Sequence, residues 1–464
     1  MDLFSIYKPA QNNGNSLALT YNLDSQLTSL QRADGRTVSY NYNTTTGLLE
    51  NLNTAESTVN MSYQYGHLIF LSEANSGTST YTWVGRLLGS KMHTGGFNFS
   101  LQNTYNLGTS RLASKVIAGQ SLSFGYDQDG YLSSVGSLQI QRDSGTPAIV
   151  GTIHGGVQQS IAYNIFGEAT SRTYTYGGST VYAESYTRDK LGRITQNTVQ
   201  TSAGSNTYGY IYNIAGRLAQ VNLNGTVTSQ YSYDEQGNRT SSTRNSEVLS
   251  GTYDSQDRIL TYGNNQYGLS ADGEVTSILN TSNGQARTFT YSSQGQLTAA
   301  KLTDGTQISY TINGENRRFA KSVNGVIQKY FEYDEGGRLV ADANQNGTLN
   351  SVYVYATQGH SPDYMIRSGV EYSFLKDQLG SIVMVVNKST GEIVQQISYD
   401  EFGRVLSDTS PGFTPFGFAG GIYDSDTKLV QFGVREYDAE TGRWISKDPI
   451  LFSGADTNLY GYVA

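Results

Sequence analysis

Few side chains in this sequence have the types and spacing that chemistry requires. The chain has no cysteine, which excludes thiolate catalysis, disulfides and zinc–thiolate sites. No Gly-x-Ser-x-Gly motif marks a nucleophilic serine, and the four histidines are too scattered for metal ligation: His67, His93, His154 and His360. Among the carboxylates, Asp438 and Asp448 lie ten residues apart. Held side by side, two carboxylates share one proton and can act as general acid and base.

An ordinary structural role explains the same two aspartates. Asp438 occupies the aspartate position of a motif that recurs along the chain, and Asp448 precedes Pro449, which favours the start of a turn. Their spacing does not by itself bring the carboxylates together, although a hairpin spanning Gly442 and Arg443 would. Glycine pairs elsewhere precede no helical pattern and indicate hairpin turns, so the sequence predicts neither a cofactor nor a metal site.

The recurring motif is Tyr-Asp-x-x-Gly-Arg-aliphatic. Clean copies begin at Tyr333 and Tyr399, and looser copies begin at Tyr212, Tyr233, Tyr253 and Tyr437. The copies at Tyr212, Tyr233 and Tyr253 are 21 and 20 residues apart. A short fixed period indicates one supersecondary unit that is stacked many times.

Each unit is predicted to be a strand, a turn and a return strand. Residues before the tyrosine alternate in polarity, as in 208–212, which is typical of a half-buried strand. The aspartate can accept a hydrogen bond from the backbone two residues on, and the glycine supplies a positive φ. Aspartate and arginine bracket the turn, so we expect a short ion pair that adds little stability. Repeats of ~20 residues imply on the order of twenty hairpins.

Composition supports an all-β fold and excludes several classes of partner. The 464 residues include 52 glycines and 36 tyrosines, and no stretch has a helical apolar period. The net charge is −8 and the arginines are spaced by the repeat, so we expect no nucleic-acid partner. No run of 18 apolar residues predicts a membrane span, and residues 1–14 lack the features of a signal peptide. We therefore expect delivery by another system, or a piece of a larger protein.

The C-terminal part resembles the RHS (rearrangement hotspot), or YD-repeat, family. The stretches that carry the resemblance to its RHS-associated core domain, besides the repeats, are 377–381, 415–420, 435–450 and 458–462. Gln378 stands where a histidine is usual in that family. The resemblance implies a YD-repeat shell over residues 1–370, with weaker repeats before 160, and a core domain over 371–464. The family's Asp-Pro-x-Gly-Leu cleavage motif is not present in the sequence.

The resemblance also implies a function. In this family the β-hairpins form a spiral sheet closed into a hollow shell, which encloses a toxic C-terminal domain; toxin-complex C components, bacterial Rhs effectors and animal teneurins share the architecture. The expected partners are such a toxin domain, which this chain lacks, and a delivery or plug protein. The expected origin is bacterial, with secretion or delivery by another system.

The resemblance assigns one activity, an aspartyl protease that cuts its own polypeptide just beyond the core domain. Asp438 and Asp448 occupy the matching positions, and Arg435 would orient or neutralise the pair. Without the cleavage motif, such a pair has no visible substrate in cis.

Two alternatives remain open. One is a cell-surface adhesion or carbohydrate-binding protein, whose tyrosine rows would stack on sugar rings. The other is a truncated remnant without an independent role. Long exposed rows of tyrosines would favour the adhesin, and inward-facing rows would favour the shell.

Overall fold

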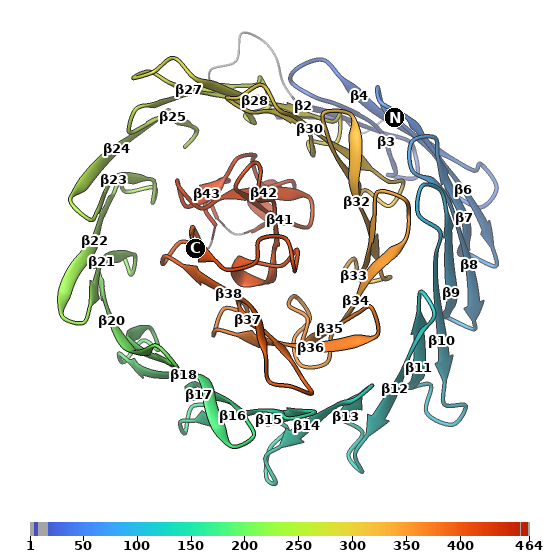
Figure 1. The fold of residues 1–464 in the computed structure, drawn as a ribbon. Helices are drawn as coiled ribbons and strands as arrows, with labels where there is room; N and C mark the ends of the chain where they lie inside the picture. Colours follow the sequence, from blue (N-terminus) through green and yellow to red (C-terminus); the bar gives the residue numbers. More distant parts are fainter. Residues whose placement is uncertain (1–3, 8–16, 455, 463–464) are drawn as a thin grey trace.

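The protein is almost entirely β-structure, as its composition predicts. The computed structural model describes residues 4–7, 17–454 and 456–462. Within these residues 39 strands form one sheet, in which each strand pairs antiparallel with the next along the chain. A separate sheet of four strands and two short 3₁₀ helices follow. Figure 1 shows that the long sheet winds into a spiral around the four-stranded sheet.

The chain has three parts: an outer coil and an inner coil, which together form the long sheet, and a central unit. The first, the outer coil, comprises β1 (Phe4–Tyr7), β2 (Leu17–Tyr21), β3 (Leu27–Gln31), β4 (Thr37–Tyr42), β5 (Leu49–Asn53), β6 (Thr58–Gln64), β7 (His67–Glu73), β8 (Gly77–Val84), β9 (Leu87–Thr94), β10 (Phe99–Tyr105), β11 (Leu112–Ile117), β12 (Gln120–Tyr126), β13 (Leu132–Val135), β14 (Leu138–Arg142), β15 (Ile149–His154), β16 (Val157–Tyr163), β17 (Ala169–Tyr176), β18 (Ser179–Arg188), β19 (Ile194–Thr201), β20 (Gly204–Tyr212), β21 (Leu218–Leu223), β22 (Thr226–Tyr233), β23 (Arg239–Arg244), β24 (Glu247–Tyr253), β25 (Ile259–Tyr262), β26 (Asn265–Leu269), β27 (Val275–Asn280), β28 (Ala286–Tyr291) and β29 (Leu297–Lys301).

The chain then continues inward. The inner coil comprises β30 (Gln307–Ile312), β31 (Arg318–Val323), β32 (Val326–Tyr333), β33 (Leu339–Asn344), β34 (Leu349–Val354), β35 (Tyr364–Arg367), β36 (Val370–Lys376), β37 (Ile382–Asn387), β38 (Ile393–Tyr399) and β39 (Val405–Asp408). The central unit, residues 409–462, contains η1 (Phe418–Gly420), β40 (Ile422–Tyr423), β41 (Leu429–Phe432), β42 (Arg435–Asp438), β43 (Arg443–Trp444) and η2 (Leu451–Gly454).

The repeat motif forms the turns that the sequence predicts. In the turn after β32, the Asp334 carboxylate accepts hydrogen bonds from the backbone N–H groups of Gly336 and Arg338, both at 3.0 Å. The Arg338 guanidinium bonds the same carboxylate at 2.6 Å, and Gly337 has a φ of +72°. The expected ion pair across the turn is therefore present, and it recurs in the turns 189–193, 254–258 and 400–404.

The spiral closes where turns of the outer coil meet. Asp272, in the turn after β26, accepts hydrogen bonds from the Arg32 side chain at 3.2 Å and from the Ala33 backbone N–H at 3.0 Å. Arg32 also bonds Glu274, and both carboxylates are buried. These contacts join segments 240 residues apart, so they close the wall without pairing strand edges.

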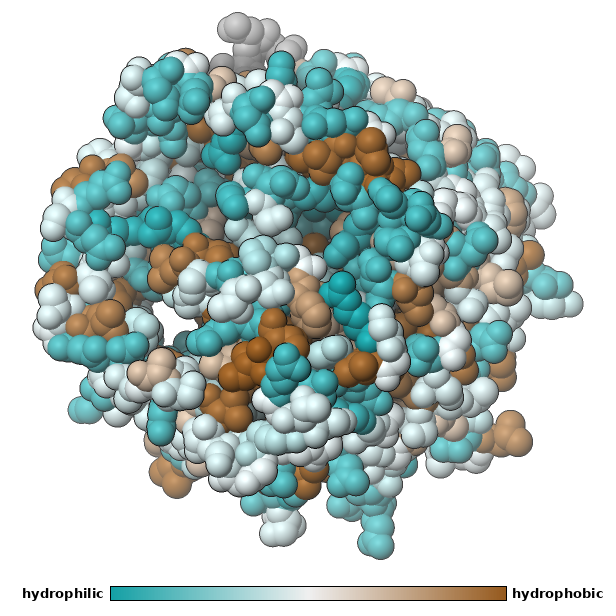
Figure 2. All heavy atoms as spheres, viewed as in Figure 1, coloured by the Kyte–Doolittle hydropathy of each residue, from teal (hydrophilic) through white to brown (hydrophobic). Residues whose placement is uncertain are grey.

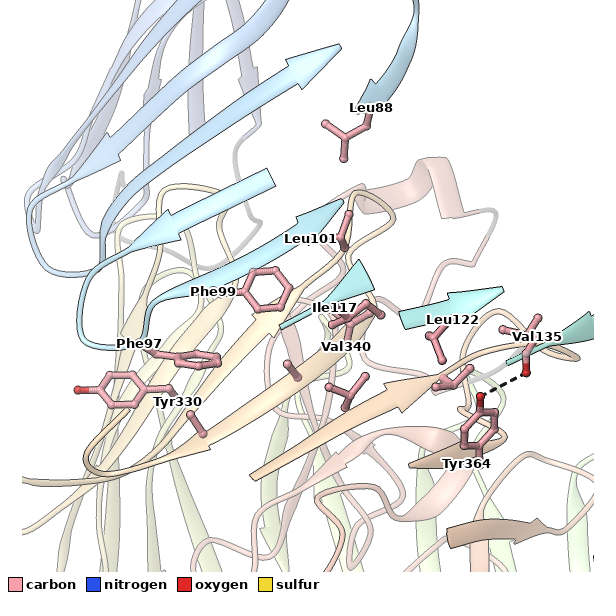
Figure 3. Close-up of a cluster of buried hydrophobic side chains, with 14 of the residues drawn as sticks. Leu88, Phe97, Phe99, Leu101, Ile117, Leu122, Val135, Tyr330, Val340 and Tyr364 are labelled. Carbon is pink, nitrogen blue, oxygen red and sulfur yellow. Dashed lines mark hydrogen bonds between the residues drawn. The ribbon is translucent and has the colours of Figure 1, made fainter. Parts of the chain in front are cut away.

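Beyond the closure, the inner coil runs inside the outer coil. A core of buried apolar side chains fills the seam between the two coils, with Leu101, Ile117 and Val135 from the outer coil facing Val340 and Tyr364 from the inner coil (Figure 3). The hydroxyl of Tyr364 donates to the carbonyl of Val135 at 3.2 Å. The largest buried cluster thus lies between layers of one sheet, because neither layer can bury its apolar face alone.

The wall encloses the central unit. Figure 1 shows β40 to β43 within the ring of strands, and Figure 2 shows an opening on the left side of this face, between the wall and the centre. The predicted fold class, an all-β spiral sheet closed into a hollow shell, is confirmed. The long sheet continues through residue 370 to β39, and the division into 1–370 and 371–464 stays a prediction.

Candidate functional site

The predicted site residues lie in the central unit. Its core consists of Phe418, Val430, Tyr437, Ala439 and Trp444, all buried. Aromatic rings fill it, and the rings of Tyr437 and Trp444 lie 5.9 Å apart in an edge-to-face arrangement. Such ring pairs contribute about 0.5–1.5 kcal/mol beyond their buried area, so β42 and β43 are held firmly.

Asp438 ends β42 and makes the hydrogen bonds of a turn. Its carboxylate accepts from the Glu440 backbone N–H at 3.0 Å and from the Thr441 hydroxyl at 2.9 Å. Its backbone carbonyl accepts from the Gly442 N–H at 2.8 Å. The side chain is buried. The bond from the Glu440 N–H matches the bond that a repeat aspartate accepts from two residues on, whereas the Thr441 hydroxyl takes the place of the arginine in the other turns. Asp438 thus has the structural role of a turn aspartate, which the sequence left open.

Asp448 is held by Arg435 at the other end of β42. The guanidinium bonds the Asp448 carboxylate at 3.0 Å and lies 4.0 Å above the ring of Trp444. Burial lowers the pKa of Arg435, and the Asp448 charge partly offsets that effect. A second oxygen of Asp448 accepts from the Ile450 backbone N–H at 3.0 Å.

The structure thus joins Arg435 to Asp448, whereas Asp438 makes its contacts in the turn after β42. Successive side chains of a strand point to opposite faces, so Arg435 and Asp438, three residues apart, project to opposite faces of β42. The predicted hairpin over 442–443 is present, but its register sets Asp438 opposite Arg443 and not opposite Asp448. Among the described residues, no hydrogen bond joins the two aspartates.

The sequence did not single out the residues that fix the central unit inside the wall. Glu436, next to the candidate arginine, makes a buried ion pair with Arg318 of β31 at 2.7 Å. Lys321 bonds Asp424 at 2.8 Å. These contacts join residues more than 100 positions apart, so local sequence patterns do not reveal them. The available signals were the regular spacing of the arginines and the acidic residues within the C-terminal stretches.

A second set of contacts joins the central unit to the opposite wall. Arg244 of β23 bonds the Glu440 carboxylate at 2.7 Å, and Arg239 donates to the Glu440 carbonyl. Arg443 donates to Asn238 at 3.2 Å. Long polar side chains therefore span from wall to centre, and burial lowers the pKa of Arg443.

One cavity of about 540 Å³ lies between the inner coil and the central unit. Its lining includes the aromatic rings of Phe331, Tyr399 and Tyr423. Within the described part of the chain, no cluster of three or more histidine, aspartate or glutamate side chains could hold a metal ion. No helix in that part is long and apolar enough to cross a membrane.

The repeat geometry agrees with a match to a family model. The model for the teneurin YD-shell matches residues 2–462. The chain belongs to the teneurin YD-shell family. The predicted membership of the wider RHS/YD-repeat family is thereby confirmed.

Relatives identified by sequence similarity cover between half and two thirds of this YD-shell chain. Teneurin-3 of Danio rerio is 31% identical over 296 residues, which are 62% of this chain and 11% of that protein. Teneurin-4 of Mus musculus is 31% identical over 305 residues, 64% of this chain and 11% of that protein. Teneurin-m of Drosophila melanogaster is 28% identical over 51% of this chain and 8% of that protein. The chain thus spans about a tenth of the length of these relatives.

Solved structures of lower similarity include toxin-complex proteins. The crystal structure of TcdB2-TccC3-TEV covers 96% of this chain at 13% identity and a TM-score of 0.47, with 31% of that chain covered. The Photorhabdus luminescens Tc holotoxin pore with the mutation TccC3-D651A covers 98% of this chain and 30% of that one, at 13% identity and a TM-score of 0.41.

Proposed function

We propose that this YD-shell encloses a polypeptide, and that its wall keeps the enclosed segment away from proteases and partners outside. The observation that carries the proposal is the side-chain closure at Arg32 and Asp272, which turns an open sheet into a continuous wall. A toxin cargo, a bacterial origin and delivery by another system belong to the same proposal. They rest on the sequence resemblance described above.

The position of the last described residues supports enclosure. Tyr460, in the central unit, donates its hydroxyl to the carbonyl of Gly273 in the outer coil at 3.0 Å. Asn458 bonds the Gln236 carbonyl at 3.2 Å. The C-terminal residues are thus tied to the wall, inside the ring of strands (Figure 1). A segment that continues beyond Tyr462 would therefore start from within the wall.

The arrangement of the tyrosines favours the shell over the adhesin. Repeat tyrosines use their hydroxyls inside the sheet, as Tyr212 does with the Ile194 carbonyl at 2.7 Å and Tyr291 does with the Val275 carbonyl at 2.8 Å. A ring held in this way between strands does not offer a flat free face to a sugar. We therefore do not propose that the rows of repeat tyrosines bind carbohydrate.

One rim of the shell has the chemistry of a surface that a plug or delivery protein would cover. In the meander, the turns that follow even-numbered strands all lie at the same rim. Seven large apolar side chains in the described part of the chain have relative exposures from 76% to 107%, and all seven lie in such turns: Leu23, Tyr65, Leu107, Ile165, Phe166, Leu191 and Ile214. Single exposed apolar residues are ordinary, but a row confined to one rim indicates an interface. A plug protein at this rim completes the proposed enclosure.

Protease protection tests the proposed function. A short unstructured peptide with a trypsin site is added after Ala464 and, in a matched protein, the same peptide is inserted at Gly145 in the exposed turn between β14 and β15. We expect the C-terminal peptide to be cut at least tenfold more slowly than the inserted one. Equal rates of cutting would refute enclosure.

A closure variant tests whether the wall causes the protection. Asp272→Ala removes the acceptor of both closing hydrogen bonds, whereas Asp304→Ala changes an exposed turn aspartate. We expect faster cutting of the C-terminal peptide in Asp272→Ala and an unchanged rate in Asp304→Ala. Loss of protection in both variants would mean that the assay reports general destabilisation and not closure.

A further inference from the structure

The seam between the two coils contains a cluster of ionisable side chains buried with Glu332. Lys91 of β9 places its ammonium 2.6 Å from the Glu315 carboxylate and 3.5 Å from that of Glu332. His93 of β9 lies 3.7 Å from Glu332, and Tyr81 of β8 donates to Glu315 at 2.5 Å. Two carboxylates therefore face one lysine across the seam.

Glu332 is the unsatisfied member of this cluster. Its side chain is fully buried on β32, and neither carboxylate oxygen has a hydrogen-bond partner in the described structure. An ionised carboxylate without hydrogen bonds is costly in such a place. His93 does not compensate for the missing bonds, because its two ring nitrogens are engaged with the Ser79 hydroxyl and the Ser76 carbonyl at 3.0 and 2.9 Å.

The protonation of Glu332 follows from these surroundings. Burial raises the pKa of Glu332 to about 7, the Lys91 charge lowers it in part, and the Glu315 charge raises it further. Burial also lowers the pKa of His93, which favours the neutral imidazole beside the carboxyl group.

A second carboxyl group on the inner coil also has a raised pKa, although, unlike Glu332, it accepts hydrogen bonds from the backbone N–H groups of Leu379 and Ser381 at 2.9 and 2.8 Å. Burial, together with the charge of Glu184 of β18, raises the pKa of Asp377, in the turn after β36, to about 7. Arg172 of β17 bonds the Asp377 backbone carbonyl at 3.2 Å and not its carboxylate.

We propose that the seam between the coils is a pH-sensitive latch, which is closed when the buried carboxyl group of Glu332 is protonated and loosened when that group ionises against Glu315. The latch concerns the two coils of the shell itself, so it stands or falls independently of any cargo.

The direction of the pH effect is fixed by the raised pKa. In an opened seam Glu332 meets water and regains its ordinary pKa of 4.5. Protonated Glu332 therefore stabilises the closed seam fully below pH 4.5. This stabilisation is lost as the pH rises toward 7, and above pH 7 the stability of the seam no longer depends on Glu332 protonation. His93 acts in the opposite direction, because its lowered pKa weakens the closed seam as the pH falls below 6.5. Variants are therefore needed to separate the pH dependence that comes from Glu332 from the pH dependence that comes from His93.

Hydrogen exchange of β9 and β32 between pH 5 and pH 8 tests the latch. The quantity to compare is the protection factor of wild type divided by the protection factor of Glu332→Gln. We expect this ratio to fall about 40-fold from pH 5 to pH 7, because the pKa of Glu332 is 4.5 when the seam is open and about 7 when it is closed. The control is Glu392→Gln, an exposed carboxylate in the turn before β38 of the inner coil, for which the ratio stays constant. A ratio for Glu332→Gln that does not change with pH would overturn the proposal.

A second variant keeps the proposal testable if Glu332→Gln does not fold. His93→Gln keeps a polar side chain beside Ser79 and removes the opposing titration. In this variant the protection of β9 and β32 is expected to fall steeply from pH 5 to pH 7 and then level off. Protection that is flat with pH in His93→Gln would equally overturn the latch.

Discussion

Tyr233 donates its phenolic hydroxyl to the backbone carbonyl of Leu218 at 2.9 Å. Leu218 directly follows the arginine of the preceding repeat, so the bond ties one repeat turn to the turn before it at the same rim. The same bond joins Tyr253 to Arg239 and Tyr333 to Arg318, both at 2.9 Å. The motif therefore recurs at a fixed period because each tyrosine must reach the end of the previous unit.

Loss of one such hydroxyl is expected to destabilise the shell. Tyr333→Phe leaves the buried carbonyl of Arg318 without its donor, which costs about 1–3 kcal/mol of unfolding free energy. Chemical denaturation of wild type and variant measures the difference. As a control, Tyr65→Phe changes a side chain that is 94% exposed and is expected to have no measurable effect. Similar values for both variants would show that the hydroxyl bond is unimportant.

The seam between the coils is expected to carry more stability than the rims. Leu101 of β10 is fully buried against the inner coil, whereas Leu107, in the next turn, is fully exposed. Leu101→Ala is predicted to cost about 2–5 kcal/mol, because it removes apolar contacts and leaves a cavity. Leu107→Ala is predicted to change stability by less than about 0.5 kcal/mol. Thermal and denaturant unfolding check both values; a Leu101→Ala protein as stable as wild type would contradict the layered core.

Acid is expected to weaken a different part of the seam. A hydrogen bond from His154 at 2.8 Å, together with Lys388 at 2.6 Å, lowers the pKa of Glu371 to about 2. Because this pKa is depressed, the stabilisation is present above pH 4.5 and is lost as the pH falls toward 2. With allowance for its partial exposure, we expect about 1–2 kcal/mol.

Unfolding midpoints between pH 5 and pH 2.5 check this acid effect. Glu371→Gln should reduce the loss of stability on acidification. Glu392→Gln, which changes an exposed glutamate on the same inner coil, should leave that loss as in wild type. Equal acid sensitivity in all three proteins would remove Glu371 as the cause.

Much of the fold could be predicted from the sequence because its determinants are local. The aspartate, glycine and arginine of a repeat turn lie within five consecutive residues. The motif alone therefore predicts the hairpin and its ion pair. The closure of the spiral is different. Arg32 meets Asp272 across 240 residues, and nothing in the neighbourhood of either residue indicates the other. The position of the central unit depends on similar long-range pairs.

The sequence could indicate which residues belong to the candidate site, but not how they are arranged. The motif at 435–448 identified Arg435 and Asp448, and the structure joins them by an ion pair. The position of Asp438 depends on strand register, which sequence spacing does not give: the turn after β42 pairs Asp438 with Arg443. The Asp438 carboxylate therefore accepts the hydrogen bonds of a turn, and the Asp448 carboxylate forms an ion pair with Arg435.

Self-cleavage remains the sharpest test of these aspartates. If they form a protease, a chain extended through an Asp-Pro-x-Gly-Leu motif will cut itself, and Asp438→Asn or Asp448→Asn will each stop the cut, as electrophoresis and mass spectrometry of the fragments would show. Asp400→Asn is the matched control, because Asp400, like Asp438, accepts a hydrogen bond from the backbone N–H two residues on and should not affect cutting. Were Asp438→Asn to behave like Asp400→Asn, Asp438 would be a turn residue only. Were all the variants to cut like wild type, the protease assignment would be lost, because neither carboxylate would then serve as the acid or base that it requires.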